Sequence, residues 1–299
     1  MILYNKIRKI EDSKMRKRLI FRIDDVGYTP AYDMGAFRVF DAGVGSSADV
    51  MFDSPDTVEA LKKLKDMPWL SVGWHRHLWE SPVLPPEEVP SLVNEHGRFK
   101  WGHRRQDLMK EATYEDAYKE FDAEMKLCYS ILGRYPDVAG VRNSDLPLEK
   151  AFKDVVEKYG IAYNIFSSAP DHRSQQKADP KYAHLNIISS AAAIKASYKF
   201  EDYKDYDALG RMVSLKWEGE EIYLYGWHPG YCDDHILKES TCNIHRCAEL
   251  QAALSDEFKN WVIENQIELI NVRDALHGTN EFQDHLKEIN SPLWVGNFK

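Results

Sequence analysis

The chain has 299 residues, of which 43% are hydrophobic, and 39 Lys and Arg against 48 Asp and Glu give it a formal net charge of −9. This composition is that of a soluble globular protein and excludes a disordered or fibrous chain. The acidic balance argues against a nucleic-acid partner, and the absence of an apolar stretch of about 18 residues or of a signal-peptide core predicts a cytoplasmic protein without a membrane partner.

Eleven histidines and eight tryptophans stand out in so acidic a chain. Histidine is the commonest metal ligand, and tryptophan offers a flat surface to sugar rings, so their positions are informative. The four cysteines form no CxxC pair and are predicted to be reduced thiols; they are Cys128, Cys232, Cys242 and Cys247.

Short β-rich runs alternate with amphipathic helical runs along the chain. Residues 1–17 are predicted to be a charged lead-in, and residues 18–299 to form one domain. Strands are predicted at 19–23, 47–52, 69–74, 138–141, 162–166, 221–227 and 267–271, and helices at 30–41, 57–65, 114–132, from about 147, and at about 248–265. The irregular segment 78–109 is predicted to be a functional loop because structureless stretches of this length are uncommon inside compact domains.

Such alternation predicts a parallel α/β sheet, either closed into a (β/α) barrel or open and doubly wound. No GxGxxG or Walker pattern follows a predicted strand, which argues against a nucleotide site. Residues 167–215 give no clear pattern and are interpreted as a loop or insertion.

Ionisable side chains gather where the predicted strands end. The carboxyl ends of parallel strands meet on one face of a barrel, where carboxylates and imidazoles would suit a divalent metal. Taken singly, the Asp pair is more typical of a helix cap or a turn, and the histidine before Pro229 is typical of a turn. If the third strand ends at Trp74, we expect at most one of its two following histidines to face the site. The strand-end residues are Asp24, Asp25, His75, His77, Asp145 and His228.

Several of these residues lie in motifs that carry a family resemblance. The run Asp24-Asp25-Val-Gly27 resembles the DDFG motif of the YdjC-like carbohydrate deacetylases, the chitooligosaccharide deacetylase group of the polysaccharide deacetylase superfamily. Further ordered segments also resemble that family: Leu70 to Leu78, Pro85 to Phe99, Trp227 to Gly230, Ser240 to Leu250 and Leu269 to Asn271.

The resemblance implies an irregular or incomplete (β/α) barrel that removes acetyl groups from N-acetylated amino sugars with the help of one divalent metal. Asp25 and His75 would then be metal ligands. Asp24 would be the general base, and His228 would stabilise or protonate the intermediate or the leaving amine.

The third ligand of the family is missing from this chain. Where the family has a histidine, Arg142-Asn-Ser-Asp145 places a carboxylate. One interpretation makes Asp145 the third ligand, which would favour Mg²⁺ and leave Zn²⁺ or Mn²⁺ as alternatives. The other is that the metal site is lost and the protein is a non-catalytic carbohydrate-binding or regulatory relative.

The remaining site predictions concern the saccharide. Arg142 is a candidate catalytic group for the developing oxyanion or a structural ion pair, and either role fits its position. The predicted substrate-binding residues are Trp74, His77, Trp79, Trp101 and Arg104, although packing of the long loop would also explain a tryptophan. Aromatic residues between 198 and 231 leave a homodimer open.

Overall fold

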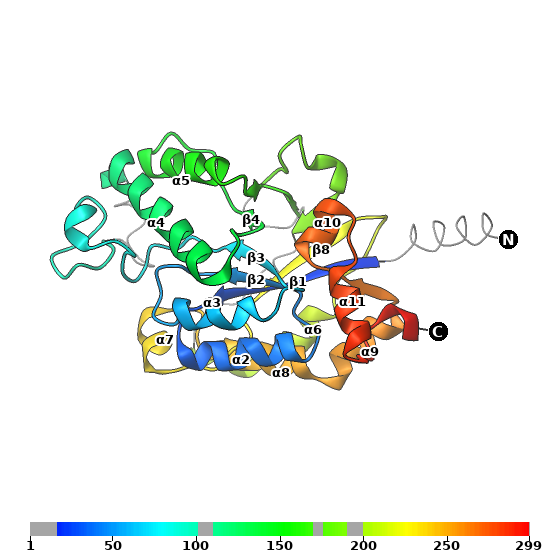
Figure 1. The fold of residues 1–299 in the computed structure, drawn as a ribbon. Coiled ribbons are helices and arrows are strands. Elements are labelled where there is room, and N and C mark those ends of the chain that lie inside the picture. Colours follow the sequence, from blue (N-terminus) through cyan, green and yellow to red (C-terminus); the bar gives the residue numbers. More distant parts are fainter. Residues whose placement is uncertain (1–16, 101–109, 170–175, 190–199, 299) are drawn as a thin grey trace.

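The computed structural model describes residues 17–100, 110–169, 176–189 and 200–298. Within them, nine strands form one sheet in the order β5-β4-β3-β2-β1-β8-β7-β6, and β9 pairs with the start of β1. All pairings between these strands are parallel. The sheet curls into a half barrel with helices around it (Figure 1), so the predicted irregular (β/α) barrel is confirmed.

The strands agree in place with the sequence pattern, although most are shorter than predicted. They are β1 Lys17–Val26, β2 Ser47–Val50, β3 Ser71–Trp74, β4 Val138–Ala139, β5 Ala162–Tyr163, β6 Ser167–Ser168, β7 Ile187–Ser189, β8 Ile222–Trp227 and β9 Ile267–Leu269. Strands β6 and β7 fall in the segment that the sequence pattern did not resolve.

Ten α-helices lie in the described residues, and none of them is long and apolar enough to cross a membrane. They are α2 Pro30–Asp41, α3 Thr57–Lys65, α4 Tyr114–Leu132, α5 Pro147–Lys158, α6 Ala208–Met212, α7 Asp234–Glu239, α8 His245–Leu254, α9 Asp256–Glu264, α10 Val272–His277 and α11 Glu281–Glu288. Short 3₁₀ helices cover Pro86–Glu88, Ala183–Leu185, Phe200–Asp205 and Val295–Asn297.

Capping residues set the helix ends. Helix α2 begins where predicted because Thr29 accepts a hydrogen bond from the Tyr32 amide and Pro30 fits the first turn. The prediction of a single helix over 248–265 is wrong, because Ser255 has an extended backbone and its side chain caps a new helix, α9. The four cysteines are free thiols, as predicted.

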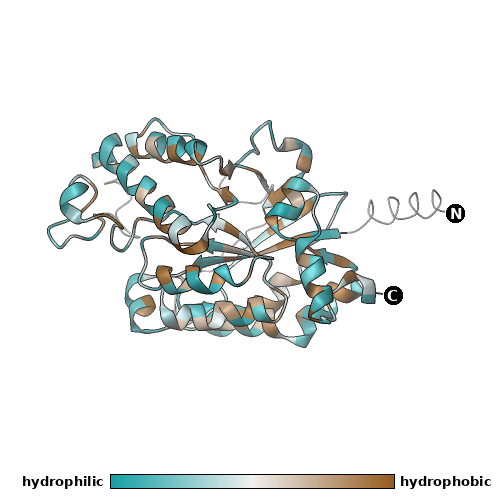
Figure 2. Cartoon of the chain, viewed as in Figure 1, coloured by the Kyte–Doolittle hydropathy of each residue, from teal (hydrophilic) through white to brown (hydrophobic). Residues whose placement is uncertain are grey.

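Alternation along the strands divides the core between the two faces of the sheet. Leu19, Phe21 and Ile23 belong to the large apolar cluster outside the half barrel, whereas Ile20 packs with Leu224 in a smaller cluster on the inner face. Surface helices carry much of the hydrophilic colouring in Figure 2. The same alternation places the charged side chains that follow Ile20 on β1 toward the inner face.

Helix α4 anchors the long loop through buried carboxylates one turn apart. Asp116 accepts a hydrogen bond from the Ser91 amide at 2.8 Å, and Glu120 accepts from the amides of Val83 at 2.6 Å and Leu84 at 3.1 Å. Burial raises the pKa of Glu120 to about 7, although the hydrogen bonds from the Val83 and Leu84 amides lower it. The described part of the predicted loop is therefore ordered against α4.

Glu120 should make folding stability depend on pH. Its pKa is higher in the folded chain than the usual 4.5, so its contribution is full below pH 4.5 and is lost as the pH rises to about 7. Urea unfolding of Glu120→Gln should show stability gained relative to wild type between pH 5 and pH 8, by up to about 3 kcal/mol.

The matched control is Glu59→Gln, which removes an exposed carboxylate on α3 that pairs with Lys62. Its stability difference from wild type should not change with pH by more than a few tenths of a kcal/mol. Parallel pH curves for wild type and Glu120→Gln would contradict the role given to Glu120.

Candidate metal centre

The inner face of the half barrel carries charge toward the carboxyl ends of its strands. Arg22 of β1, Asp49 of β2 and His75, directly after β3, line a common pocket of about 190 Å³. Deeper in the sheet, Val138 and Leu224 give this pocket an apolar wall. The residues therefore change from apolar to charged along the strands, toward the edge at which (β/α) barrels place their active sites.

Two glycines make room for these charged groups. Gly73 faces Asp49 across the β2–β3 pairing, and a Cβ atom at Gly73 would lie 1.9 Å from Asp49 Oδ1. Gly226 of β8 faces Arg22 of β1, and a Cβ atom at Gly226 would lie 2.9 Å from Asp24 Oδ2. Side chains at either position would displace the carboxylates.

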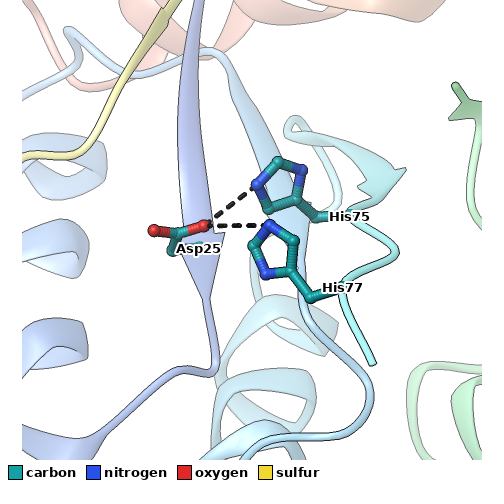
Figure 3. A group of neighbouring side chains, drawn as sticks. All are labelled: Asp25, His75 and His77. Carbon is teal, nitrogen blue, oxygen red and sulfur yellow. Dashed lines mark ion pairs between the residues drawn. The ribbon is translucent and has the colours of Figure 1, made fainter. Parts of the chain in front are cut away.

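Asp25 lies at the centre of the group. Its φ of 63° is in the left-handed region, which Asp tolerates better than most residues, and the pairing of β1 with β2 shifts here. Its Oδ1 lies 2.9 Å from His75 Nε2 and 3.7 Å from His77 Nε2. Figure 3 shows both imidazole rings turned toward this carboxylate. Its Oδ2 accepts a hydrogen bond of 2.6 Å from Arg246.

Arg246 is a buried partner that the sequence analysis did not identify. The side chain is 1% exposed, bonds through Nε to the Cys242 carbonyl at 2.6 Å, and lies over the rings of Tyr28 and Tyr32. Burial alone would raise the pKa of Asp25, but Arg246 and the hydrogen bond from His75 hold it well below its usual range.

Both histidines after β3 face Asp25, so the prediction that at most one would do so is wrong. Side chains continue to alternate between the two faces beyond the end of β3 at Trp74. Arg76 points away from the two histidines and forms a buried ion pair of 2.8 Å with Glu149 of α5. The Arg76 guanidinium also lies 4.4 Å from the centre of the Phe152 ring. This anchor on the outer side turns His75 and His77 toward the same inner side.

His75 has an acidic partner on each ring nitrogen. Nε2 faces Asp25, and Nδ1 lies 3.0 Å from Asp49 Oδ2. Burial disfavours the charged ring, but the two carboxylates outweigh it and raise the pKa of His75 to about 10. Asp49 was not predicted as a site residue, although a lone acidic residue inside the buried run Ser47–Val50 was the signal.

Asp24 and His228 face each other beside this group. Asp24 forms a two-point ion pair with Arg22, at 2.6 and 3.0 Å, and its Oδ2 lies 3.9 Å from His228 Nε2. The other side of His228 faces Glu249, whose Oε2 lies 3.7 Å from Nδ1 and accepts the His228 amide at 2.6 Å. A carboxylate and an imidazole thus lie in reach of one another at the strand ends.

Glu249 is a second buried residue that the sequence analysis gave no role. It is fully buried on α8, and the Tyr206 hydroxyl donates to its Oε1 at 2.6 Å. Burial would lower the pKa of His228, but the neighbouring Cys242, Glu249 and Asp25 raise it well above its usual value. The arrangement favours a charged imidazole that can donate a proton.

Asp25, His75 and His77 together could hold a metal ion. Each offers one oxygen or nitrogen atom, and these three atoms lie within 4.8 Å of one another. No other cluster of three His, Cys, Asp or Glu side chains in the described parts of the chain meets this criterion. One carboxylate and two imidazoles form a ligand set that Zn²⁺ and other divalent transition metals accept, with further positions left for water or substrate.

Asp145 does not lie in this group, so the structure does not bring the predicted ligands Asp25, His75 and Asp145 together. Its side chain is fully exposed in the turn before α5 and lies 3.1 Å from Lys150 Nζ, so solvent and a lysine balance its charge. In the structure, the third side chain beside Asp25 and His75 is His77.

The structure also separates the predicted substrate-binding residues. Trp74 is 2% exposed and donates through Nε1 to Glu124 at 2.7 Å, so it is a core residue and cannot stack on a sugar. Trp79 is half-buried and stacks on His77 with ring centres 3.7 Å apart. Trp101 and Arg104 lie outside the described residues.

Arg142 lies at the edge of the pocket that His75 lines. Its side chain is 64% exposed, and Nη1 lies 3.9 Å from Glu149, which is already paired with Arg76. Arg142 is thus free to move toward a ligand, and its catalytic role stays a prediction.

Comparison with known proteins agrees with this architecture. The chain is 27% identical to a carbohydrate deacetylase of Enterococcus faecalis, with 85% of this chain and 97% of that protein covered. It is 25% identical to a chitooligosaccharide deacetylase of Serratia marcescens, over 84% and 96% of the two chains. A crystal structure of a proposed cellobiose-phosphate cleavage protein of Enterococcus faecalis superposes with a TM-score of 0.63 and 25% identity, over 86% and 97% of the chains.

A sequence profile of YdjC-like proteins matches residues 18–264, most of the described sheet and the whole group around Asp25. The chain therefore belongs to the YdjC-like protein family.

Proposed function

We propose that this protein is a metal-dependent carbohydrate deacetylase that hydrolyses N-acetyl groups of amino sugars or their oligomers. The observation that carries the proposal is the group of Asp25, His75 and His77 at the strand ends, with Asp24 and His228 beside it. The deacetylase names of the relatives in Enterococcus faecalis and Serratia marcescens support the same reaction class.

The proposed ligands fit a divalent cation. Asp25 turns one oxygen toward the two imidazoles, and the other oxygen is held by Arg246. Two imidazole nitrogens favour Zn²⁺ or another transition metal over Mg²⁺, which prefers oxygen ligands. When bound, the cation would supply a Lewis acid that polarises the acetyl carbonyl.

Asp24 and His228 would move the protons of the reaction. Hydrolysis joins the oxygen of water to the acetyl carbon and breaks the C–N bond, which yields acetate and an amine. Asp24 would accept a proton from the attacking water, and its two-point pair with Arg22 fixes the carboxylate for this step. His228, whose pKa its neighbours Cys242, Glu249 and Asp25 raise against the effect of burial, would protonate the departing nitrogen.

The saccharide would lie over the strand ends. Arg142, exposed at the edge of the pocket, would approach a carbonyl oxygen or a sugar hydroxyl. Trp79 has one ring face covered by His77, so it would contact a sugar through its edge or its other face. Trp101 and Arg104 stay predicted substrate contacts.

The ligand assignment predicts opposite results for two variants. In chelator-stripped protein reloaded with Zn²⁺, His77→Ala should weaken Zn²⁺ binding by at least about 10-fold. Losing a metal ligand should cost more affinity than losing a group that only orients a ligand, which already costs about this much. Asp145→Ala should leave the affinity unchanged because its carboxylate pairs with Lys150 in solvent. Isothermal titration calorimetry measures both, and the reverse order would restore Asp145 as the third ligand.

The proton-transfer roles predict a separation of binding from turnover. His228→Gln should lower acetate release from N-acetylglucosamine oligomers by about 10²- to 10⁴-fold and leave Zn²⁺ affinity near that of wild type. The control His285→Gln changes a histidine on α11 that stacks on Trp69, and it should release acetate at the wild-type rate.

The same assay tests the reaction itself. If the metal-loaded wild-type protein binds these oligomers and releases no acetate, deacetylation of this substrate class is wrong and the non-catalytic carbohydrate-binding alternative holds.

A further inference from the structure

Asp49 is a buried charge with no role in the proton transfers described above. It lies in the middle of β2, where the whole strand is buried, and its side chain is 8% exposed. A buried carboxylate is unfavourable unless charged or hydrogen-bonding partners surround it, so its contacts indicate what it is for.

Those contacts are two cationic groups on neighbouring strands. Asp49 Oδ2 lies 3.0 Å from His75 Nδ1 and 3.4 Å from Arg22 Nη1. Arg22 in turn holds Asp24 through two hydrogen bonds. Asp49 is therefore the group through which a proposed metal ligand, His75, is tied to the proposed base.

The neighbouring strand leaves space for this carboxylate alone. A Cβ atom at Gly73 would lie 1.9 Å from Asp49 Oδ1 and 3.0 Å from its Cγ atom, so any larger residue would push Asp49 away from His75. The pocket beside His75 is lined by the same Asp49 and Arg22. The absence of a side chain at Gly73 therefore leaves room for the Asp49 carboxylate beside His75.

The ring geometry gives the contact a consequence for metal binding. An imidazole that donates its Nδ1 hydrogen to a carboxylate presents the lone pair of Nε2 to a metal, and Nε2 of His75 is the atom that faces Asp25 Oδ1. We propose that Asp49 is the positioning residue of the metal centre, which fixes the ring of His75 with Nδ1 as donor and Nε2 as ligand. This inference rests on the metal site of the proposed function.

The test uses the full chain, stripped with a chelator and titrated with Zn²⁺ by calorimetry. Asp49→Leu, which keeps the branched outline of the side chain with somewhat larger end groups and removes the acceptor, should weaken Zn²⁺ binding by about 10- to 100-fold. Asp49→Asn, which keeps a neutral acceptor, should fall between Asp49→Leu and wild type. Equal affinities for all three proteins would overturn the proposal.

The matched control is Asp24→Asn. It removes a carboxylate from the same arginine, Arg22, but leaves the contact of Asp49 with His75 in place, so its loss of Zn²⁺ affinity should be smaller than that of Asp49→Leu. A loss as large as that of Asp49→Leu would mean that charge alone matters and would overturn a positioning role.

A spectroscopic readout distinguishes positioning from general destabilisation. In the Zn²⁺ form, ¹⁵N NMR of ring-labelled histidine should show His75 protonated at Nδ1 and metal-bound at Nε2. The opposite pattern in the wild type would overturn the proposal, and it can be read even if Asp49→Leu fails to fold. In Asp49→Leu, the Nδ1 hydrogen should lose the downfield shift that a carboxylate acceptor gives it.

The two proposals fail in different ways. Wild-type protein that binds Zn²⁺ through His75 Nε2 but releases no acetate refutes deacetylation and leaves the role of Asp49 standing. Wild-type protein that releases acetate, with Zn²⁺ affinity and His75 spectrum unchanged in Asp49→Leu, refutes the role of Asp49 alone. Wild-type protein that binds no Zn²⁺ refutes both.

Discussion

The structure depends on how three buried carboxylates are balanced at the inner edge of the sheet. The side chains of Asp24, Asp25 and Asp49 are at most 10% exposed. Arg22 is shared by Asp24 and Asp49, and Arg246 holds Asp25 from the other side. Removing one partner of such a buried pair leaves a bare charge and is far costlier than losing a surface ion pair. This balance fixes the carboxylates before any ligand arrives.

The balance constrains the backbone as well as the side chains. Gly73 and Gly226 leave space opposite Asp49 and Asp24, and Asp25 adopts a positive φ that directs its carboxylate toward the histidines after β3. These features would be weaknesses in an ordinary strand, where glycine packs poorly and a left-handed residue interrupts pairing. They are explained here by the charged group that they accommodate.

Helix bounds and strand-end residues could be predicted from the sequence because short-range interactions determine them. The bounds of α2, α3 and α4 followed from their periodicity and end residues, and the strand-end rule identified Asp24, Asp25, His75 and His228 as neighbours. The partners Arg246 and Glu149 could not be found in this way, because they lie 221 and 73 residues from Asp25 and Arg76. His77 was predicted as a substrate contact and not as a possible metal ligand, because its direction is set together with the pairing of Arg76 and Glu149.

The exchange of Asp145 for His77 changes the electrostatics of the proposed metal site. Two carboxylates and one imidazole would carry two negative charges, whereas Asp25 with two imidazoles carries one. Arg246 partly neutralises that single charge through its hydrogen bond to Asp25 Oδ2. A cation bound by this set would keep more of its charge to polarise a carbonyl, because its ligands would neutralise less of it. In the proposed site, Arg246 on Asp25 and Asp49 on His75 would then supply the orientation that a more strongly charged ligand set would supply by attraction alone.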